Sequence, residues 1–266
     1  MNRTALIQAI SSKKSFLCVG LDTDINKIPA HLGRNPEGVL AFNKAIIEAT
    51  HEYAVSYKLN TAFYETLGAE GWHLMEETLK LIPENIFTIA DAKRGDIGNT
   101  SSMYARAFFE RLPFHSITIN PYMGSDSVQP FLEFDGKWAI LLGLTSNKGA
   151  QDFQMQQSGD EEVYKKVIRT SAQWGDASNM MYVVGATKAE YLSEIRQIIP
   201  DHFLLVPGVG AQGGSLEEVA KHGANKDCGL LINASRSILY AASDESFAEK
   251  AGEEAFRMQQ EMRNFC

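Results

Sequence analysis

A single α/β domain of the (β/α)8 or TIM-barrel class, spanning residues 1–266, is the fold that the sequence predicts. Short apolar, β-like runs recur eight times along the chain. Segments with helical periodicity separate them, for example "PEGVLAFNKAIIEATHEY" at 36–53. Eight βα units in about 250 residues match the size of this barrel. A doubly wound sheet is the alternative, although that fold usually contains fewer strands.

The eight runs are predicted as strands because they are short and nearly continuous in apolar residues. Such runs are typical of parallel strands that helices cover. In chain order they are "SFLCVGLD" (15–22), "YAVSYKLN" (53–60), "IFTIADAK" (86–93), "SITINPY" (116–122), "WAILLGLTS" (138–146), "MYVVGAT" (181–187), "FLLVPGVG" (203–210) and "GLLINASR" (229–236).

Polar residues stand at the end of nearly every run, among them Asp22, Lys58 and Asn120. In a (β/α)8 barrel these ends converge on one face, and that face carries the chemistry. Polar ends are also expected wherever a strand reaches water, which accounts for the Asn and Thr residues. It accounts less well for lysines and acids within the runs, because a lone buried charge is costly.

The overall composition excludes several classes of function. A net charge of -8 and a pI near 5.3 argue against non-specific nucleic-acid binding but leave a small anionic substrate open. No apolar run approaches the roughly 18 residues of a membrane span, and the N-terminus has no signal-peptide core, so we expect a cytoplasmic protein without membrane contact. The three cysteines lack CxxC spacing and the six histidines are scattered, so we expect neither a disulfide scaffold nor a metal site.

The stretch "DAKRGD" concentrates ionisable groups at the end of the third run. Asp91 and Lys93 are two apart on a strand and therefore share one face. Gly95 permits a tight turn that brings Asp96 to the rim or out to a neighbouring subunit. Lys58 approaches from the second run. We expect an alternating array whose carboxylates keep Lys93 charged as a proton donor; an ordinary ion-pair network is the alternative.

A glycine-rich segment, "PGVGAQGGS" at 207–215, follows the seventh run and precedes a helix. It contains G-x-G-x-x-G, but it occurs late and the next strand ends in "NASR", with no acid for a ribose, so we reject a dinucleotide fingerprint. Loops after strands seven and eight of a barrel commonly bind phosphate. Arg236 would add a bidentate cation for the same phosphate; a plain glycine turn and a surface arginine are the alternative.

The longest connection starts as "NKGAQDFQMQQSGDEE" (147–162), after the fifth run. It is polar and rich in Gln and Gly. A long loop on the catalytic face is a candidate lid, and a plain surface insertion is an equally good interpretation.

Taken in order, the motifs resemble one family. "DAKRGDI" is similar to the D-x-K-x-x-D-I motif of the orotidine 5'-phosphate decarboxylases, and "GLDTD", "YKLN", "NPYMG", "LTSN", "PGVGAQGG" and "SRSI" resemble that family's blocks in its order. The resemblance covers about residues 16–240 and is greatest to the longer bacterial subfamily. Several ordered blocks are far more specific than any single motif.

The resemblance implies a role for each matching residue. It implies that Lys93 delivers a proton, Asp91 sits against the substrate carboxylate, and Asp96 reaches the neighbour's site across a homodimer interface. The implied substrate contacts are Lys58 and Asp22 on ribose, Ile97 and Thr100 beside Asp96, Ser146 (or Thr145) and Pro207 around the pyrimidine, and Gln212, Ser235 and Arg236 near phosphate. Ser235 departs from the pattern, because many relatives have glycine there.

The implied reaction is the conversion of orotidine monophosphate to uridine monophosphate and carbon dioxide, the last step of de novo pyrimidine synthesis, without metal or cofactor. Sister enzymes of the same superfamily, which act on sugar phosphates with magnesium, carry a related D-x-K-x-x-D strand and remain an alternative. A barrel that binds a nucleotide without turnover is a third interpretation. Lys93 with two aspartates argues against it, because binding alone needs no proton donor.

Overall fold

Eight parallel strands close into a barrel in the computed structural model, which describes residues 1–186, 189–209 and 214–266. The barrel order is β1-β10-β9-β8-β5-β4-β3-β2. The barrel strands are β1 (Leu17–Gly20), β2 (Ala54–Asn60), β3 (Phe87–Arg94), β4 (Ser116–Ile119), β5 (Trp138–Leu144), β8 (Met180–Val184), β9 (Phe203–Pro207) and β10 (Leu230–Ala234). Each lies within, or within one residue of, a predicted run. The barrel prediction is therefore confirmed, and the doubly wound alternative is wrong because β1 pairs with both β2 and β10.

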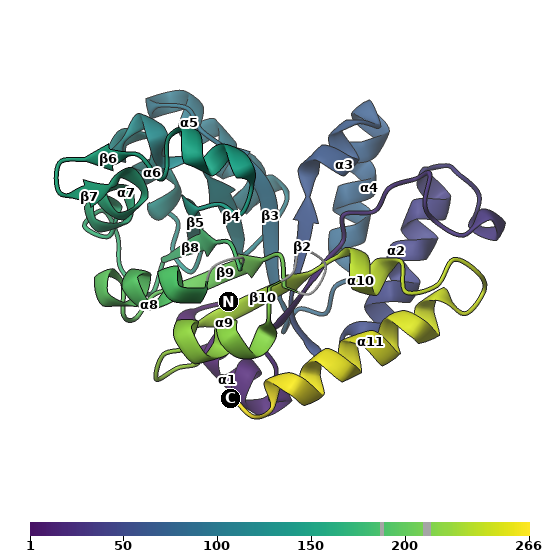
Figure 1. The fold of residues 1–266 in the computed structure, drawn as a ribbon. Coiled ribbons are helices and arrows are strands. Elements are labelled where there is room, and N and C mark those ends of the chain that lie inside the picture. Colours follow the sequence, from purple (N-terminus) through teal and green to yellow (C-terminus); the bar gives the residue numbers. More distant parts are fainter. Residues whose placement is uncertain (187–188, 210–213) are drawn as a thin grey trace.

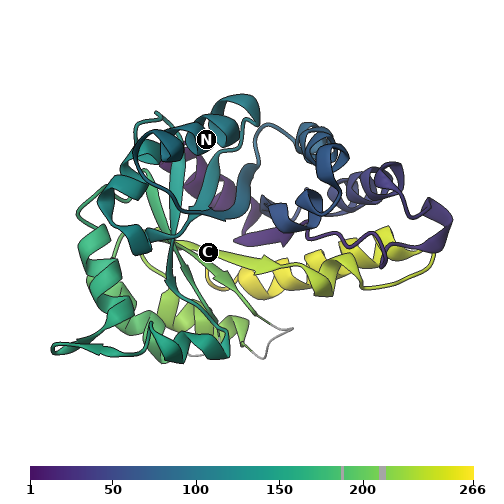
Figure 2. The same cartoon turned by 90° about the horizontal axis from the view of Figure 1, so that it is seen from above.

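Helices follow the strands and surround the barrel (Figures 1 and 2). They are α1 (Arg3–Lys13), α2 (Pro36–Thr50), α3 (Thr61–Glu65), α4 (Gly68–Leu81), α5 (Gly98–Arg106), α6 (Ser125–Leu132), α7 (Val163–Ser171), α8 (Ala189–Ile198), α9 (Leu216–Gly223), α10 (Arg236–Leu239) and α11 (Phe247–Met262). Short helical turns are η1 (Ala30–Leu32), η2 (Ala107–Arg111, a π-helix), η3 (Pro121–Met123) and η4 (Lys148–Asp152). In the described residues, no helix combines the length and the apolar character needed to cross a bilayer.

The boundaries of α2 follow from its sequence. The Asn35 side chain accepts a hydrogen bond from the backbone N–H of Gly38 at 2.8 Å, and Pro36 occupies the first helical turn, where its missing N–H costs nothing. The helix then buries Val39, Phe42 and further apolar residues at helical spacing. Its predicted range of 36–53 is therefore nearly the observed one.

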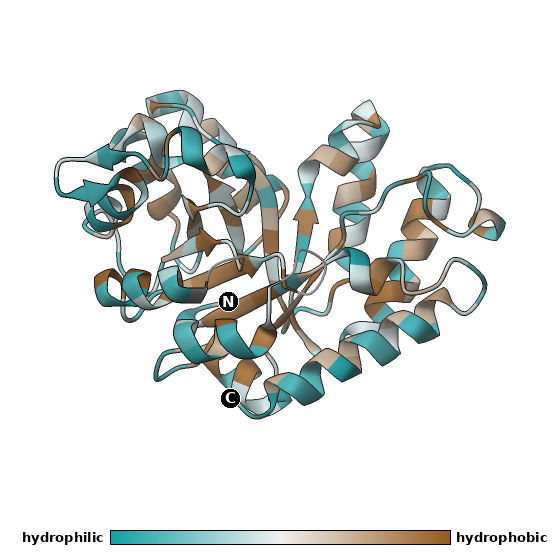
Figure 3. Ribbon diagram, viewed as in Figure 1, coloured by the Kyte–Doolittle hydropathy of each residue, from teal (hydrophilic) through white to brown (hydrophobic). Residues whose placement is uncertain are grey.

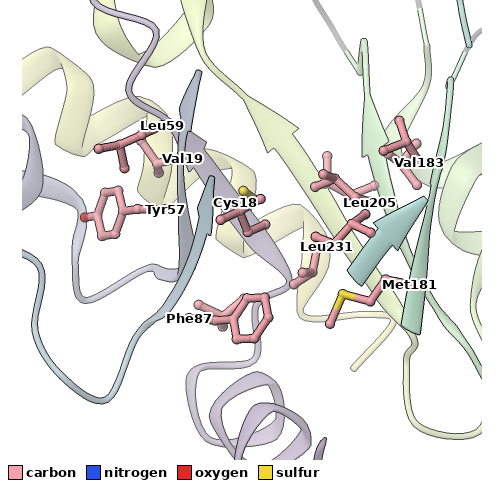
Figure 4. Close-up of a cluster of buried hydrophobic side chains, with 14 of the residues drawn as sticks. Cys18, Val19, Tyr57, Leu59, Phe87, Met181, Val183, Leu205 and Leu231 are labelled. Atoms are coloured by element: carbon pink, nitrogen blue, oxygen red, sulfur yellow. The ribbon is translucent and has the colours of Figure 1, made fainter. Parts of the chain in front are cut away.

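The strands carry two apolar surfaces, one facing the helices and one facing the barrel interior. Figure 3 shows the apolar residues concentrated on the strands and the hydrophilic ones on the outer helices. In Figure 4, Tyr57 and Leu59 lie on one side of their strand, whereas Cys18 lies toward Leu205 and Leu231. All five are buried. The barrel interior is therefore packed with apolar side chains at the level of these residues.

The connection after β5 is folded, contrary to the expectation of a loop. It forms η4 and then a two-stranded hairpin, β6 (Gln157–Ser158) and β7 (Glu161–Glu162). Gln154 fastens the segment to the barrel: its Oε1 accepts from the Thr145 N–H at 2.8 Å, and its Nε2 donates to the Thr145 hydroxyl at 2.8 Å. The hairpin and this anchor account for the Gln- and Gly-rich composition. Movement of the segment as a lid stays a prediction.

Candidate active site

A cavity of about 340 Å³ opens where the barrel strands end. Its lining comes from both the N-terminal and the C-terminal strands, as expected if the strand ends converge. The lining residues are Asp22, Lys27, Lys58, Phe63, Asp91, Lys93, Val183, Leu205, Pro207, Gly208, Val209, Asn233, Ala234, Ser235, Arg236, Ser237 and Tyr240.

A buried ammonium group lies at the centre of the charged side of this cavity. Lys58 Nζ is 2.8 Å from Asp22 Oδ1 and 3.1 Å from Asp91 Oδ2. Its side chain is only 5% exposed, whereas a lone buried lysine would be costly. Two carboxylates from the neighbouring strand ends therefore hold Lys58 in place, and Lys58 holds them at a fixed separation.

Lys93 occupies the other side of Asp91. Its Nζ donates to Asp91 Oδ1 at 2.6 Å, which is the length of a strong charge-assisted hydrogen bond. The Lys93 side chain is 49% exposed, against 11% for Asp91. Of the predicted array, Lys58, Asp91 and Lys93 lie together, but Asp22 and not Asp96 supplies the second carboxylate of this chain, so the observed order is Asp22–Lys58–Asp91–Lys93. Of its two lysines only Lys93 is accessible.

The electrostatics of Asp91 follow from this arrangement. Burial alone would raise the pKa of its carboxyl group, but the Lys58 and Lys93 ammonium groups outweigh burial and lower the pKa to about 2. Burial would likewise lower the pKa of Lys58, and the Asp22 and Asp91 carboxylates outweigh it and raise that pKa. At neutral pH both Asp91 and Lys58 are charged.

The backbone at Lys93 is unusual. Its φ is 46°, in the left-handed region that non-glycine residues rarely occupy. Residues 91–93 were predicted to form a regular strand, but the β3–β4 ladder shifts register between Ala90 and Arg94. The two side chains still meet, although strand alternation alone is not the reason.

Asp22 is fixed from the opposite side by Ser235. The Ser235 hydroxyl donates to Asp22 Oδ2 at 2.8 Å and accepts from Asn233 Nδ2 at 3.3 Å. A Cβ at Gly20 would stand 2.0 Å from Ser235 Oγ, so β1 needs glycine where it passes this serine. The Ser235 hydroxyl thus joins the charge array, and its proximity to phosphate stays a prediction.

Tyr240 holds the loop after β1. Its hydroxyl accepts from the Asp24 N–H at 2.9 Å and donates to the Asp22 carbonyl at 3.4 Å. Lys27, in the same loop, lies over the Tyr240 ring with its Nζ 5.7 Å from the ring centroid. Neither cavity residue was predicted from the sequence, because neither belongs to a strand end. Asn233 was not predicted either, although its two-residue spacing from Ser235 at the end of β10 could have indicated it.

Some of the residues predicted to lie near the phosphate are found at the cavity. Arg236 and Pro207 both line the cavity, from the ends of β10 and β9. The Arg236 side chain is exposed, and it forms no ion pair with any of the residues that the structure describes. Gln212 lies outside the described residues, so its predicted phosphate contact stays a prediction.

The predicted site residues Asp96, Ile97 and Thr100 lie outside the lining of this cavity. Asp96 is half-buried and its Oδ1 accepts from the Ile97 N–H at 2.8 Å, while Ile97 and Thr100 are exposed. No ion pair joins Asp96 to Lys58 or Lys93 of its own chain, as far as the described residues go. This position agrees with the expectation that Asp96 serves a neighbouring subunit, but does not test it.

Thr145 and Ser146, the two candidates for the pyrimidine contact, have different surroundings. The Thr145 hydroxyl is engaged by Asn147 Oδ1 at 2.6 Å and by Gln154. Both residues line a second cavity of about 410 Å³ beside the ends of β5 and β8. A Cβ at Gly185, the residue after β8, would come within 2.7 Å of the Ser146 Cβ, so these two residues pack closely. The pyrimidine contact assigned to Ser146, with Thr145 as the alternative, stays a prediction.

Throughout 1–186, 189–209 and 214–266, no group of three or more His, Cys, Asp or Glu side chains is arranged to hold a metal ion. Asp22 and Asp91 instead direct oxygens to lysine ammonium groups.

The chain is similar in sequence and in fold to known proteins. The sequence model of the "Orotidine 5'-phosphate decarboxylase / HUMPS family" matches residues 15–251. The chain is 61% identical over 265 residues to an orotidine 5'-phosphate decarboxylase of Christiangramia forsetii, covering 98% of this chain and 97% of the relative. It is 58% identical over 266 residues to one of Phocaeicola vulgatus, covering 98% of each. Among solved structures it is similar to the Leishmania donovani OMP decarboxylase, with a TM-score of 0.83 and 38% identity over 98% of this chain and 99% of that chain.

The lowered pKa of Asp91 predicts an acid-dependent loss of stability. Because the folded-state value of about 2 lies below the ordinary 3.8, the stabilisation is complete above pH 3.8 and is lost as the pH falls through 2. Between about pH 5 and pH 2, wild type should lose about 2 kcal/mol more unfolding free energy than Asp91→Asn. Urea unfolding at a series of pH values measures this difference. Parallel pH profiles for the two proteins would contradict it.

Proposed function

This chain belongs to the orotidine 5'-phosphate decarboxylase / HUMPS family, and on that premise we propose that it converts orotidine 5'-monophosphate to uridine 5'-monophosphate and carbon dioxide. The observation that carries the proposal is the half-exposed Lys93 ammonium group, hydrogen-bonded to Asp91 at 2.6 Å in the strand-end cavity. A proton donor in a fixed position is what this reaction requires of the protein.

The proposed reaction moves one electron pair, that of the bond between the pyrimidine ring and the carboxylate. The bond between carbon six of the pyrimidine and the carboxylate breaks, the pair remains on carbon six, and carbon dioxide leaves. The resulting carbanion lies in the ring plane, where no π-system delocalises it. The Lys93 ammonium stabilises the developing charge and then transfers a proton to carbon six. The neutral amine regains its proton from solvent, so no metal or cofactor enters the balance.

Lys58 and Lys93 have different roles because they differ in solvent exposure. Lys58 is 5% exposed and bound between two carboxylates, so it acts as a structural clamp that can also reach a ribose hydroxyl. Lys93 is 49% exposed and has one carboxylate partner. Proton transfer to a substrate atom needs a donor that the substrate can contact. This difference supports Lys93 as the donor.

Asp91 has two candidate effects on the reaction. A substrate carboxylate about 4 Å away at an effective dielectric constant near 20 would be repelled by roughly 4 kcal/mol, and its loss as carbon dioxide would relieve this repulsion. The other effect is to orient the Lys93 ammonium, for which the 2.6 Å hydrogen bond is direct support. We assign orientation as the main role.

One lysine does not account for catalysis, since enzymes lower barriers by about 8 to 23 kcal/mol. We infer that binding energy from phosphate and ribose supplies much of the rest, through Arg236 and Gln212 on phosphate and Asp22 on ribose. The exposed, unpaired Arg236 side chain in the described cavity supports this part of the proposal.

We also propose a homodimer in which Asp96, with Ile97 and Thr100, completes the neighbour's site. Large apolar side chains are exposed beside the ends of β3 and β4, where a partner would cover them: Ile97, Met103, Tyr122 and Met123 are 52%, 54%, 88% and 46% exposed. Exposed apolar patches of this kind commonly mark interfaces. The proposed setting is the cytoplasm, as the last step of de novo pyrimidine synthesis.

The first test is turnover of orotidine monophosphate in the presence of a metal chelator, followed by ultraviolet absorbance. We expect turnover by wild type, a fall of at least about 100-fold in Lys93→Ala because a general acid is lost, and no change in the exposed control Lys44→Ala. Absence of turnover, together with magnesium-dependent activity on a sugar phosphate, would contradict the proposed function and assign the chain the activity of the sister enzymes.

The second test concerns the remote phosphate. Arg236→Ala should lower kcat/KM for orotidine monophosphate by at least about 10-fold, because it loses charge-assisted hydrogen bonds to the phosphate. On the nucleoside orotidine, which has no phosphate, the same variant should match wild type. The exposed Arg106→Ala serves as the control on both substrates. Equal losses on the two substrates would contradict a role for Arg236 at phosphate.

The third test concerns the shared site. Asp96→Ala and Lys93→Ala, each inactive alone, should recover about one quarter of wild-type activity after mixing and re-association, because half of the dimers are then mixed and one of their two sites is intact. The matched control mixes Asp91→Ala with Lys93→Ala. Since these two residues belong to the same chain's array, no recovery is expected. No recovery in the first mixture would exclude shared sites.

A further inference from the structure

Thr118 contacts both reacting members of the charge array, yet it lies beneath the cavity and is completely buried. Its hydroxyl donates to Asp91 Oδ1 at 3.0 Å. The same oxygen accepts the backbone N–H of Lys93 at 2.9 Å. One side chain on β4 thus joins the carboxylate of Asp91 to the main chain of Lys93.

The β3–β4 ladder explains why a side chain is needed at this point. Ala90 pairs with Ile117 and Arg94 pairs with Ile119, so residues 91–93 of β3 stand opposite Thr118 alone. A regular ladder would offer each N–H a backbone carbonyl. At this bulge the Lys93 N–H finds the Thr118 hydroxyl instead.

The bulge also contains the left-handed backbone of Lys93, with φ at 46°. Such a conformation persists in a non-glycine residue only when its surroundings hold it. We propose that Thr118 is a positioning residue for decarboxylation: its hydroxyl holds the strained backbone of Lys93 and the carboxylate of Asp91 in the geometry that aims the Lys93 ammonium at the substrate. This inference rests on the proposed function.

The chemistry of the hydroxyl suits this position. A threonine hydroxyl donates one hydrogen bond and accepts others, so it can serve an anion and an N–H at once. The Thr118 hydroxyl and the Lys93 ammonium both donate hydrogen bonds to Oδ1 of Asp91, whereas Lys58 pairs with Oδ2. The two oxygens of Asp91 are therefore assigned to different partners, and rotation of the carboxylate would break contacts on both sides. Valine has the same shape but neither donor nor acceptor.

The expected effect falls on the chemical step. Thr118 is absent from the cavity lining, so its loss leaves the groups that bind phosphate and ribose in place. Thr118→Val should lower kcat by about 10- to 100-fold, the range that one hydrogen bond to a charged group represents. KM should change by no more than about threefold, because ground-state binding is retained. Thr118→Ser, which keeps the hydroxyl, should recover most of kcat.

The test compares the kinetics of wild type, Thr118→Val and Thr118→Ser on orotidine monophosphate. Thr50→Val is the matched control, because it deletes another fully buried threonine hydroxyl, one that bonds the Ile46 carbonyl and Tyr57 away from the cavity. Urea unfolding of each variant separates a loss of stability from a loss of rate. If Thr118→Val does not fold, Thr118→Cys replaces it, with a thiol that is only a weak donor.

A kcat unchanged in Thr118→Val, or a loss in Thr118→Ser or Thr50→Val as large as in Thr118→Val, would overturn the proposal. Inactivity of wild type would instead overturn the proposed function, and a second measurement would then test the positioning role of Thr118. That measurement is a crystal structure of Thr118→Val, in which Lys93 should leave the left-handed region or its Nζ should move away from Asp91. Unchanged geometry there would also overturn it.

Discussion

The ion pairs of Lys58 are the constraint on which the rest of the site depends. A lysine with 5% exposure is tolerable only between carboxylates, and Asp22 and Asp91 supply them from the two strand ends beside β2. Burying this ammonium forces the ends of β1, β2 and β3 into one arrangement. Each carboxylate then needs a second partner to fix its orientation, and finds it in Ser235 on one side and Lys93 on the other.

The array has a rigid interior and an accessible edge. Moving outward from Lys58, side-chain exposure rises to 11% at Asp91 and 49% at Lys93. In the proposed reaction, the rigid part would supply a preorganised field, which a catalyst of charge-forming reactions needs before substrate arrives. The accessible part is held by one carboxylate and by a strained backbone. Local strain in an otherwise regular strand is typical of functional sites, where the surrounding structure holds it.

The barrel and the array could be predicted from sequence because both obey short-range rules. Apolar runs separated by helical segments determine the eight strands, and two-residue spacing correctly predicted that Asp91 and Lys93 meet, although the bulge between them means that regular strand alternation is not the reason. The bulge at residues 91–93 could not be predicted, because it is visible only in the register with β4. Thr118 was missed for the same reason, and Lys27 and Tyr240 because they belong to a loop and a helical turn. The hairpin after β5 was missed because its strands have two residues each.

The charge distribution explains how an acidic protein suits a highly anionic substrate. The whole chain carries a net charge of -8, yet four cationic side chains line the cavity against two carboxylates. Both carboxylates are already bonded to lysines, and Lys27 is 3.6 Å from the Asp24 carboxylate, so among the described residues Arg236 is the lining cation that forms no ion pair. A phosphate with a carboxylate on the same molecule matches such a site, since fields inside a cleft are focused by its low-dielectric walls and outweigh the distant surface charge. Local arrangement, not net charge, therefore decides what this barrel binds.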